Sequence, residues 1–223
     1  MNRLLLIVIL TLSLQSLTKA HDIEDFQIDG ISVGDSLLDF VSEKYIINEI
    51  NDNAPNYKSF NPKDKFGEIY IDSKKGKYST LSFFVKIDDP KYKIYMLRGI
   101  MSFNDSLDEC LKQKTDTTRD LASIFLNTET MDDKFTSDLD PTGRSIFYNT
   151  SFSLHGKDEV TVNCSDWEES LRIENNWING LSVILQKKEF IKWIQRNYRL
   201  DRRTHKPEVS GSIPFIQSLI QHF

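Results

Sequence analysis

The sequence predicts an α+β fold in which a mostly antiparallel sheet, built from two hairpins plus one strand, packs with helices. Two pairs of segments alternate between apolar and polar residues, and each pair is joined by a short polar connection. Strands joined so closely must be antiparallel, because a parallel crossover takes about a dozen residues or more. A further alternating segment predicts one more strand, and apolar residues at helical spacing predict the helices.

The elements follow one another as helix, hairpin, helix, hairpin, strand and helix. The polar, Pro- and Gly-punctuated segment 56–77 is predicted to be a loop with at most a short strand at 68–72, and 128–144 is predicted to be a second loop. A C-terminal amphipathic helix is expected beyond 212, with its apolar side chains on one face. The expected helices are 36–50, 105–127 and 187–199, and the expected strands are 79–87, 92–103, 146–154, 160–164 and 181–185.

Residues 1–20 have the three parts of a secretory signal: Arg3, an apolar run at 4–12, and a small residue, Ala20, at the expected cleavage point. The apolar run is much shorter than the roughly 20 residues that span a bilayer, and no later segment is long and apolar enough. We expect a periplasmic or secreted product without a transmembrane span after signal removal. The predicted domains are 1–20, signal peptide; 21–200, single α+β globular domain; and 201–223, linker and C-terminal helix.

The chain is acidic, with a formal net charge of −5 over 223 residues. An acidic protein of this size is not a general nucleic-acid binder. Basic residues nevertheless gather near the C-terminus, where they could contact an anionic surface or form the polar face of a helix whose other face is core. The residues of this possible contact are Lys187, Lys188, Lys192, Arg196, Arg199, Arg202 and Arg203.

Two cysteines, Cys110 and Cys164, are present in a chain expected to enter an oxidising compartment. Two cysteines allow one intramolecular pairing, and neither has a second Cys or a His nearby at metal-ligand spacing. The sequence therefore predicts a disulfide. In the chain-entropy description of a cross-link, a loop of this length stabilises the fold by roughly 4 kcal/mol.

The string Gly34-Asp35-Ser36-Leu37 resembles the motif of the secreted GDSL serine esterases. That resemblance implies a nucleophilic Ser36 on a parallel sheet, an oxyanion donor at Asn104, and an acid and base at Asp201 and His205. Two of these motif matches depart from the family pattern. Ser102 replaces a glycine two residues before Asn104, and four positions rather than three separate Asp201 from His205. The antiparallel strands predicted above also conflict with a parallel esterase sheet.

Helix capping is the alternative explanation for the same string. Gly-Ile followed by Asp-Ser-Leu occurs twice, once ending at Leu37 and once ending at Leu107. In the second copy Ser106 and Glu109 have the spacing of a capping box, in which side chains bind the free N–H groups of a first helical turn. The predicted helix caps are Asp35, Ser36, Asp105 and Ser106.

No cofactor and no metal site is expected. Residues 138–143 match the opening of a calcium loop, but Asn149 stands where the loop requires a glutamate, so a turn before a strand is favoured. The four histidines are scattered, without a pair at ligand spacing.

A second resemblance covers most of the chain. The signal ending LTKA, the stretch DFQIDGISVGDSLLDF, the single cysteines in DECLKQK and NCSDW, and KEFIKWI are similar to a family of uncharacterised exported proteins of marine bacteria. It implies an exported, disulfide-closed domain and no particular chemistry. The expected function is non-catalytic binding of an envelope component or small ligand, and the alternative is a degenerate GDSL-type serine esterase.

Overall fold

The computed structural model of the chain describes residues 22–53, 65–73, 76–103, 106–137 and 139–204. Helices and strands alternate in blocks, with a helix, three strands, a helix, three strands, a short helix, one strand and a last helix. The strands are β1 Phe66–Asp72, β2 Thr80–Lys86, β3 Ile94–Ser102, β4 Glu129–Thr136, β5 Ile146–Ser153, β6 Glu159–Asp166 and β7 Gly180–Gln186. The helices are α2 Glu43–Asn53, α3 Leu107–Ile124, α4 Glu169–Glu174 and α5 Lys188–Thr204, with 3₁₀ turns η1 Ile23–Asp25 and η2 Leu37–Asp39.

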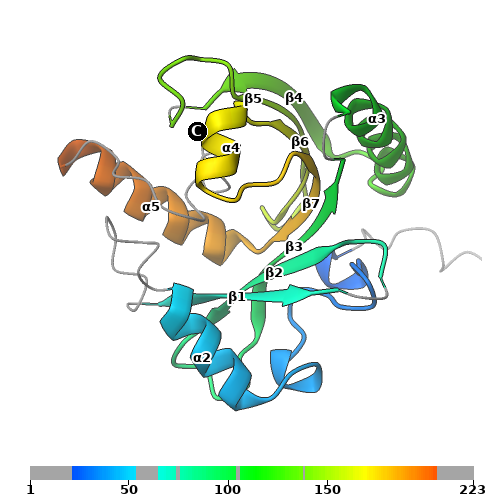
Figure 1. Cartoon of the computed structure of the whole chain (residues 1–223). Coiled ribbons are helices and arrows are strands. Elements are labelled where there is room, and N and C mark those ends of the chain that lie inside the picture. Colours follow the sequence, from blue (N-terminus) through cyan, green and yellow to red (C-terminus); the bar gives the residue numbers. More distant parts are fainter. Residues whose placement is uncertain (1–21, 54–64, 74–75, 104–105, 138, 205–223) are drawn as a thin grey trace, which may run out of the picture.

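All seven strands form one antiparallel sheet in the order β1-β2-β3-β7-β6-β5-β4. The predicted α+β class, with two hairpins and one strand, is wrong. Each predicted hairpin is part of a three-stranded meander, and β7 joins the two meanders at the centre of the sheet. The sheet therefore organises the whole described chain, and the helices lie on its faces (Figure 1).

The two strands at the sheet edges account for this error. β1 is longer than the short strand predicted inside a loop, and β4 lies in a segment predicted to be a loop throughout. Most side chains of β4 are exposed, and acidic residues and one lysine dominate its sequence. Edge strands commonly carry such charges, which discourage pairing with other chains, but the charges also hide the alternation that identifies a strand.

The first predicted helix also begins later than expected. Residues 37–39 form a single 3₁₀ turn, and the α-helix starts only at Glu43. Ser42 precedes that helix and accepts a hydrogen bond from the backbone N–H of Tyr45 at 3.3 Å. The last helix, α5, runs to Thr204, and the C-terminal amphipathic helix expected beyond 212 lies outside the described residues.

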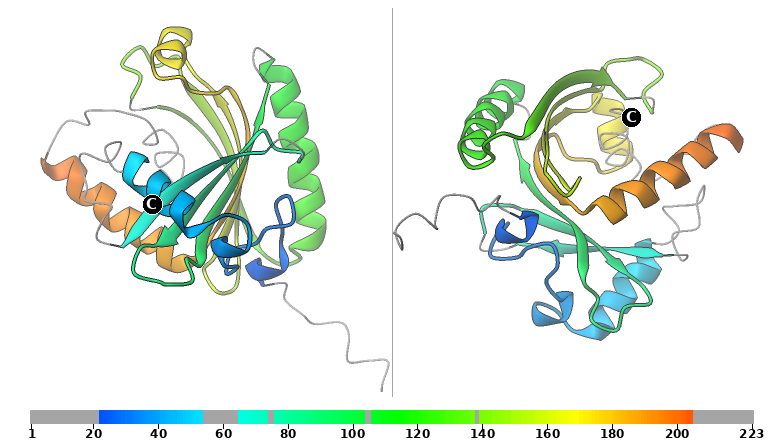
Figure 2. Two further views of the ribbon diagram at one scale, coloured as in Figure 1. Left: turned by 60° about the horizontal axis from the view of Figure 1, so that its bottom comes forward. Right: turned by 180° about the vertical axis from the view of Figure 1, so that it is seen from behind.

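The sheet is strongly curved, and the helices divide between its two faces. Strands β4 to β7 curl around α4, whereas α3 lies on their outer side (Figures 1 and 2). Helix α2 packs on β1 from the outer face, and α5 packs on the inner face beside β3. The outer, convex face is apolar and contains the main hydrophobic core.

Two glycines allow close packing on the convex face. A Cβ on Gly67 would lie 2.6 Å from the side chain of Ile50 on α2, and one on Gly99 would lie 2.7 Å from the ring of Tyr78. Real Cβ contacts are almost never this short. These glycines therefore set how closely α2 and the segment before β2 approach the sheet.

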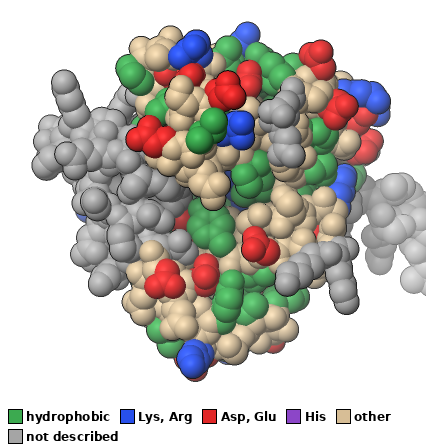
Figure 3. Space-filling view, in the orientation of Figure 1, with side chains coloured by type: hydrophobic (Ala, Val, Ile, Leu, Met, Phe, Trp, Pro, Cys, Tyr) green, Lys and Arg blue, Asp and Glu red, His purple; other side chains and the backbone are tan. Residues whose placement is uncertain are grey.

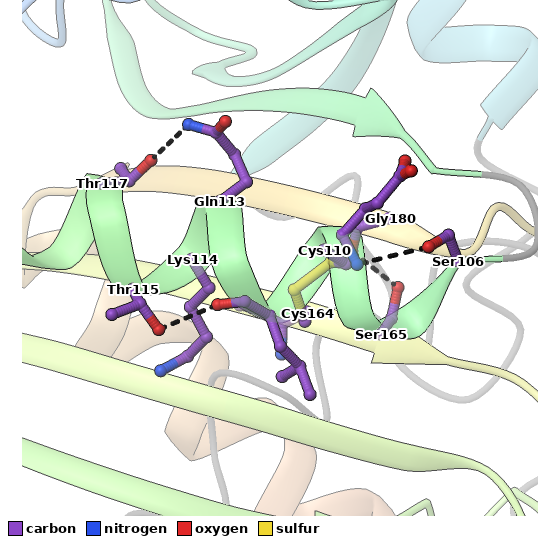
Figure 4. Close-up of a disulfide and its surroundings, with 12 residues drawn as sticks. Ser106, Cys110, Gln113, Lys114, Thr115, Thr117, Cys164, Ser165 and Gly180 are labelled. Carbon is purple, nitrogen blue, oxygen red and sulfur yellow. Dashed lines mark hydrogen bonds between the residues drawn. A yellow bond between two sulfur atoms is a disulfide. The ribbon is translucent and has the colours of Figure 1, made fainter.

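The disulfide is confirmed between Cys110 and Cys164. It joins the first turns of α3 to β6, with the two Cα atoms 6.0 Å apart (Figure 4). Both cysteines are buried within the core of the convex face. The bond therefore fastens the long helix α3 to the centre of the sheet.

Candidate functional site

The concave face of the sheet carries a set of polar side chains from six neighbouring strands. Side chains at directly paired positions of adjacent antiparallel strands lie side by side on one face. Three consecutive rows of paired positions across β1, β2, β3, β7, β6 and β5 contain most of the set. We call the following residues the polar face: Glu68, Ser82, Arg98, Ser182, Gln186, Glu159, Thr161, Asn163, Ser165, Asn149 and Ser151. All of them except the partly buried Arg98 are buried.

Hydrogen bonds link neighbouring members of the polar face. Ser151 and Thr161 share a hydrogen bond of 3.1 Å between their hydroxyl groups, and the hydroxyl of Thr161 donates to the Glu159 carboxylate at 3.0 Å. The Asn163 amide donates to the Asn149 side-chain oxygen. Buried polar groups are usually paired in this way, since an unpaired one loses its contact with water without compensation.

Arg98 is the cation of the polar face and is hydrogen-bonded to the neighbouring strand β7. Its Nε donates to the Ser182 hydroxyl at 3.0 Å, and Ser82 donates to the Glu68 carboxylate at 3.1 Å in the adjacent row. Burial lowers the pKa of the Arg98 guanidinium, whereas the nearby Tyr70 and Glu68 oppose this shift. Because an arginine stays charged in proteins, Arg98 is a cation in this part of the face, and it interacts electrostatically with Glu68.

Glu159 and Gln186 face each other at the end of the polar face nearest α5. They are directly paired residues of β6 and β7. Burial raises the pKa of the Glu159 carboxyl, and the hydrogen bond from Thr161 only partly offsets this effect. The side-chain nitrogen of Gln186 is buried and has no hydrogen-bond partner among the described residues.

Aromatic clusters lie at both ends of the polar face. At the α5 end, Phe190 and Trp193 pack against Phe66 and Phe84 with ring centroids 4.8 to 6.4 Å apart. At the α4 end the rings of Phe147, Trp167, Trp177 and Phe135 are in contact. The polar residues are thus enclosed between apolar ends, an arrangement in which polar contacts are shielded from bulk water.

A pocket of about 290 Å³ opens beyond the strand ends, between α3 and α4. Its lining residues include Asp166, Glu169, Arg172 and one half of the disulfide, Cys110. Burial raises the pKa of Asp166. Ser165 also lines the pocket, so the pocket adjoins the polar face at this end.

The structure places Ser36 away from both of these features. Its hydroxyl donates to the backbone oxygen of Lys91 at 2.6 Å, and its backbone bridges to Lys93. Asn104 and His205 lie outside the described residues, as does the side chain of Asp201. The sheet next to Ser36 is antiparallel throughout, in contrast to the parallel sheet that the esterase resemblance implies.

The residues predicted as helix caps have different roles. Ser106 precedes α3 and accepts a hydrogen bond from the N–H of Glu109 at 3.3 Å. Ser36 precedes η2 but makes no capping hydrogen bond, and Asp35 accepts from the N–H of Ser32 at 2.8 Å. Asp105 lies outside the described residues.

The predicted basic surface is only partly formed by free side chains. Lys187 pairs with Glu24, whereas Lys192 and Arg196 are exposed on α5, opposite its buried aromatic residues. The side chains of the predicted contacts beyond 196, Arg199, Arg202 and Arg203, lie outside the described residues, and Lys188 is partly buried. On the face shown in Figure 3, acidic side chains are scattered among hydrophobic ones.

The segment that resembles a calcium loop is a hydrogen-bonded turn. Asp140 accepts from the backbone N–H groups of Thr142, Arg144 and Ser145 at 2.7 to 3.0 Å. Burial opposes ionisation of this carboxyl, but the hydrogen bonds from Thr142 and Ser145 outweigh burial and hold its pKa far below the usual value. Within the described ranges, no three His, Cys, Asp or Glu side chains are arranged to hold a metal ion.

In the described part of the chain, each helix is too short or too polar to cross a bilayer.

The sequence alone did not identify the polar face. The alternation in β2 and β5 predicts half-buried strands, and such strands have their polar residues, here Ser82, Asn149 and Ser151, on the solvent side. Their chemistry was the available signal, because strand surfaces in water usually include lysine and glutamate, whereas these positions carry small uncharged groups. The raised pKa of Glu159 depends on burial by distant segments, which a strand pattern does not reveal.

Comparisons of the chain with known protein families, with curated proteins and with solved structures find no match.

Proposed function

We propose that the protein is an exported, disulfide-closed binding protein whose polar face binds a small polar ligand without catalysing a reaction. One observation carries this proposal: the concave face of the sheet is buried, yet it carries many hydroxyl, amide and carboxyl groups among its apolar side chains. Apolar residues would stabilise a purely structural face more effectively, since burying polar groups brings little net stability. Ligand sites commonly combine an enclosed concave surface with a few convergent polar groups.

The export part of the proposal is supported by the signal-like residues 1–20 and by the disulfide, which forms in oxidising compartments. The partner class is a small molecule or envelope component of the periplasm or the extracellular space. Exposed Lys192 and Arg196 on α5 would favour an anionic envelope surface as an additional contact.

Binding can be tested by thermal unfolding of the purified, oxidised protein with a panel of small polar compounds. The panel contains neutral saccharides, amino acids, di- and tricarboxylates and polyamines, each at about 10 mM. A ligand that binds only the folded state raises the unfolding temperature, with a gain of about 2.7 kcal/mol at 100 times its Kd. We expect at least one class to raise it.

A matched pair of variants locates the binding. Thr161→Val removes a hydroxyl from the polar face, and Thr150→Val removes one from the convex face of the neighbouring strand at nearly the same volume. We expect Thr161→Val to abolish or weaken the ligand-induced shift and Thr150→Val to retain it. A panel without any stabilising compound, or equal shifts in both variants, would contradict binding at the polar face.

A further inference from the structure

The side-chain nitrogen of Gln186 is a buried donor of this face that has no hydrogen-bond partner among the described residues. Gln186 is only 1% exposed. Native proteins rarely leave a buried donor unpaired, and those that do usually bind a water or a ligand there. The neighbours of Gln186 in its row are Met96 on β3 and Glu159 on β6.

The carboxyl group beside it has spare acceptor capacity. One oxygen of Glu159 accepts from Thr161, and a carboxyl group has room for several further hydrogen bonds. Directly paired residues have their Cβ atoms roughly 5 Å apart, so one ligand group can reach both side chains. Gln186 and Glu159 thus present a donor and an acceptor side by side.

The chemistry of this pair selects the ligand class. A carboxylate or phosphate could accept from Gln186, but it would meet the carboxyl of Glu159. An ammonium group could donate to Glu159, but it has no lone pair for the Gln186 amide. A hydroxyl group both donates and accepts, so it satisfies both side chains at once.

The rest of the polar face extends the same preference. Beyond Glu159 the chain of hydroxyls continues through Thr161 and Ser151. The cation Arg98 already lies beside the carboxylate of Glu68 and is bonded to Ser182, so it is not free to neutralise an anion.

We propose that Gln186 and Glu159 bind the hydroxyl groups of a neutral polyhydroxylated ligand, a saccharide or polyol. This inference rests on the proposed function and names the ligand class of the same face. Gln186 donates to a ligand hydroxyl, and that hydroxyl or its neighbour donates to Glu159.

Isothermal titration calorimetry of the oxidised protein with glucose, galactose, maltose, trehalose and sorbitol tests the proposal, with citrate and spermidine as charged comparisons. We expect at least one neutral compound to bind and both charged compounds to fail. Gln186→Met retains a similar volume and removes the donor, so it should weaken binding at least tenfold. Thr118→Val is the matched control, because the Thr118 hydroxyl is also buried and unpartnered but lies on α3, across the sheet.

The outcomes separate this inference from the broader one. If a charged compound binds, and its binding depends on Thr161 but not on Gln186, the ligand class is wrong while binding at the polar face stands. If no compound binds, this inference fails, and binding at the polar face then stands only if another compound of the wider thermal-unfolding panel binds and depends on Thr161. If Gln186→Met does not fold, the affinities of single-deoxy derivatives of the bound sugar are measured with the wild-type protein. The inference would be overturned if removing each hydroxyl in turn left the affinity unchanged.

Discussion

Two serines within the same short sequence pattern have different roles in the folded chain. Ser106 accepts a hydrogen bond from the first turn of α3, whereas Ser36 donates to a neighbouring loop and is followed by only one 3₁₀ turn. The pattern identified the helix beginning at 107, since that segment continues for several turns. It could not distinguish the first copy, whose hydroxyl is engaged by Lys91, a residue 55 positions away.

Replacing the cap of α3 should destabilise the protein by a modest amount. Ser106→Ala removes the acceptor for the Glu109 N–H, and we expect a loss of about 1 kcal/mol in the free energy of unfolding. Ser106→Asp retains an acceptor at the same position and should remain close to wild type. Urea unfolding of the three proteins measures the difference, and an alanine variant as stable as the aspartate variant would contradict the capping role.

The buried Glu159 should make stability depend on pH. Its pKa is raised by burial, so the folded state binds the proton more tightly than the unfolded state does. Ionisation of the buried carboxyl therefore lowers the free energy of unfolding. This loss is absent below the ordinary pKa of a glutamate, grows as the pH rises to the raised pKa, and stays constant above it. Glu159→Gln retains the acceptor for Thr161 and cannot ionise, so it should be more stable than wild type at pH 7.

This prediction is tested by measuring the unfolding temperatures of the ligand-free proteins from about pH 3.5 to about pH 8, a range that includes the titration of a glutamate. The gain from Glu159→Gln should disappear at the acidic end. Glu129→Gln, at an exposed position of the same row, is the control and should have little effect at any pH. A gain that is equal at both ends would show that ionisation of Glu159 is not its cause.

At the scale of elements, the central strands and the long helices were predictable and the edges were not. Strands β2, β3, β5, β6 and β7 alternate clearly because one of their faces packs into the apolar core. Strand β4 has no such requirement, and β1 is completed by side chains of α2: Tyr45 donates to the backbone oxygen of Tyr70, and Glu49 accepts from its N–H. These long-range contacts position an edge strand but do not require an alternation of apolar and polar residues in its sequence.

The attachment of α3 to the sheet should depend strongly on the disulfide. The bond closes a loop of 54 residues, and in the chain-entropy description it stabilises the fold by about 4 kcal/mol. We expect Cys110→Ala/Cys164→Ala to lower the urea midpoint substantially and to increase amide hydrogen exchange in α3 more than in β7. Wild type treated with reductant should behave like the double variant, and uniform exchange across the chain would indicate that α3 is held by its other contacts.

At the scale of the whole molecule, both faces of one curved sheet are interior, whereas the alternation in the sequence predicts one core face and one solvent face. The convex face is apolar, as the alternation implied, and the helices α2 and α3 cover parts of it. The opposite residues became interior because the sheet curls and because α4 and α5 lie on its concave side. Curvature and coverage arise from contacts between distant segments, so the candidate site could not be predicted even though most of its strands could.

Export should be visible in the mature chain. If the signal-like segment is cleaved after Ala20, protein expressed from the full sequence in a Gram-negative host will be recovered from the periplasm or medium with His21 as its first residue. Cys110 and Cys164 should then resist thiol alkylation until a reductant is added, because oxidation precedes recovery. Arg3→Glu together with Lys19→Glu would remove the positive charge of the segment and should reduce export. Recovery of chains that retain Met1 in the cytosolic fraction, with both thiols open to alkylation, would be inconsistent with an exported protein and would place its ligand inside the cell.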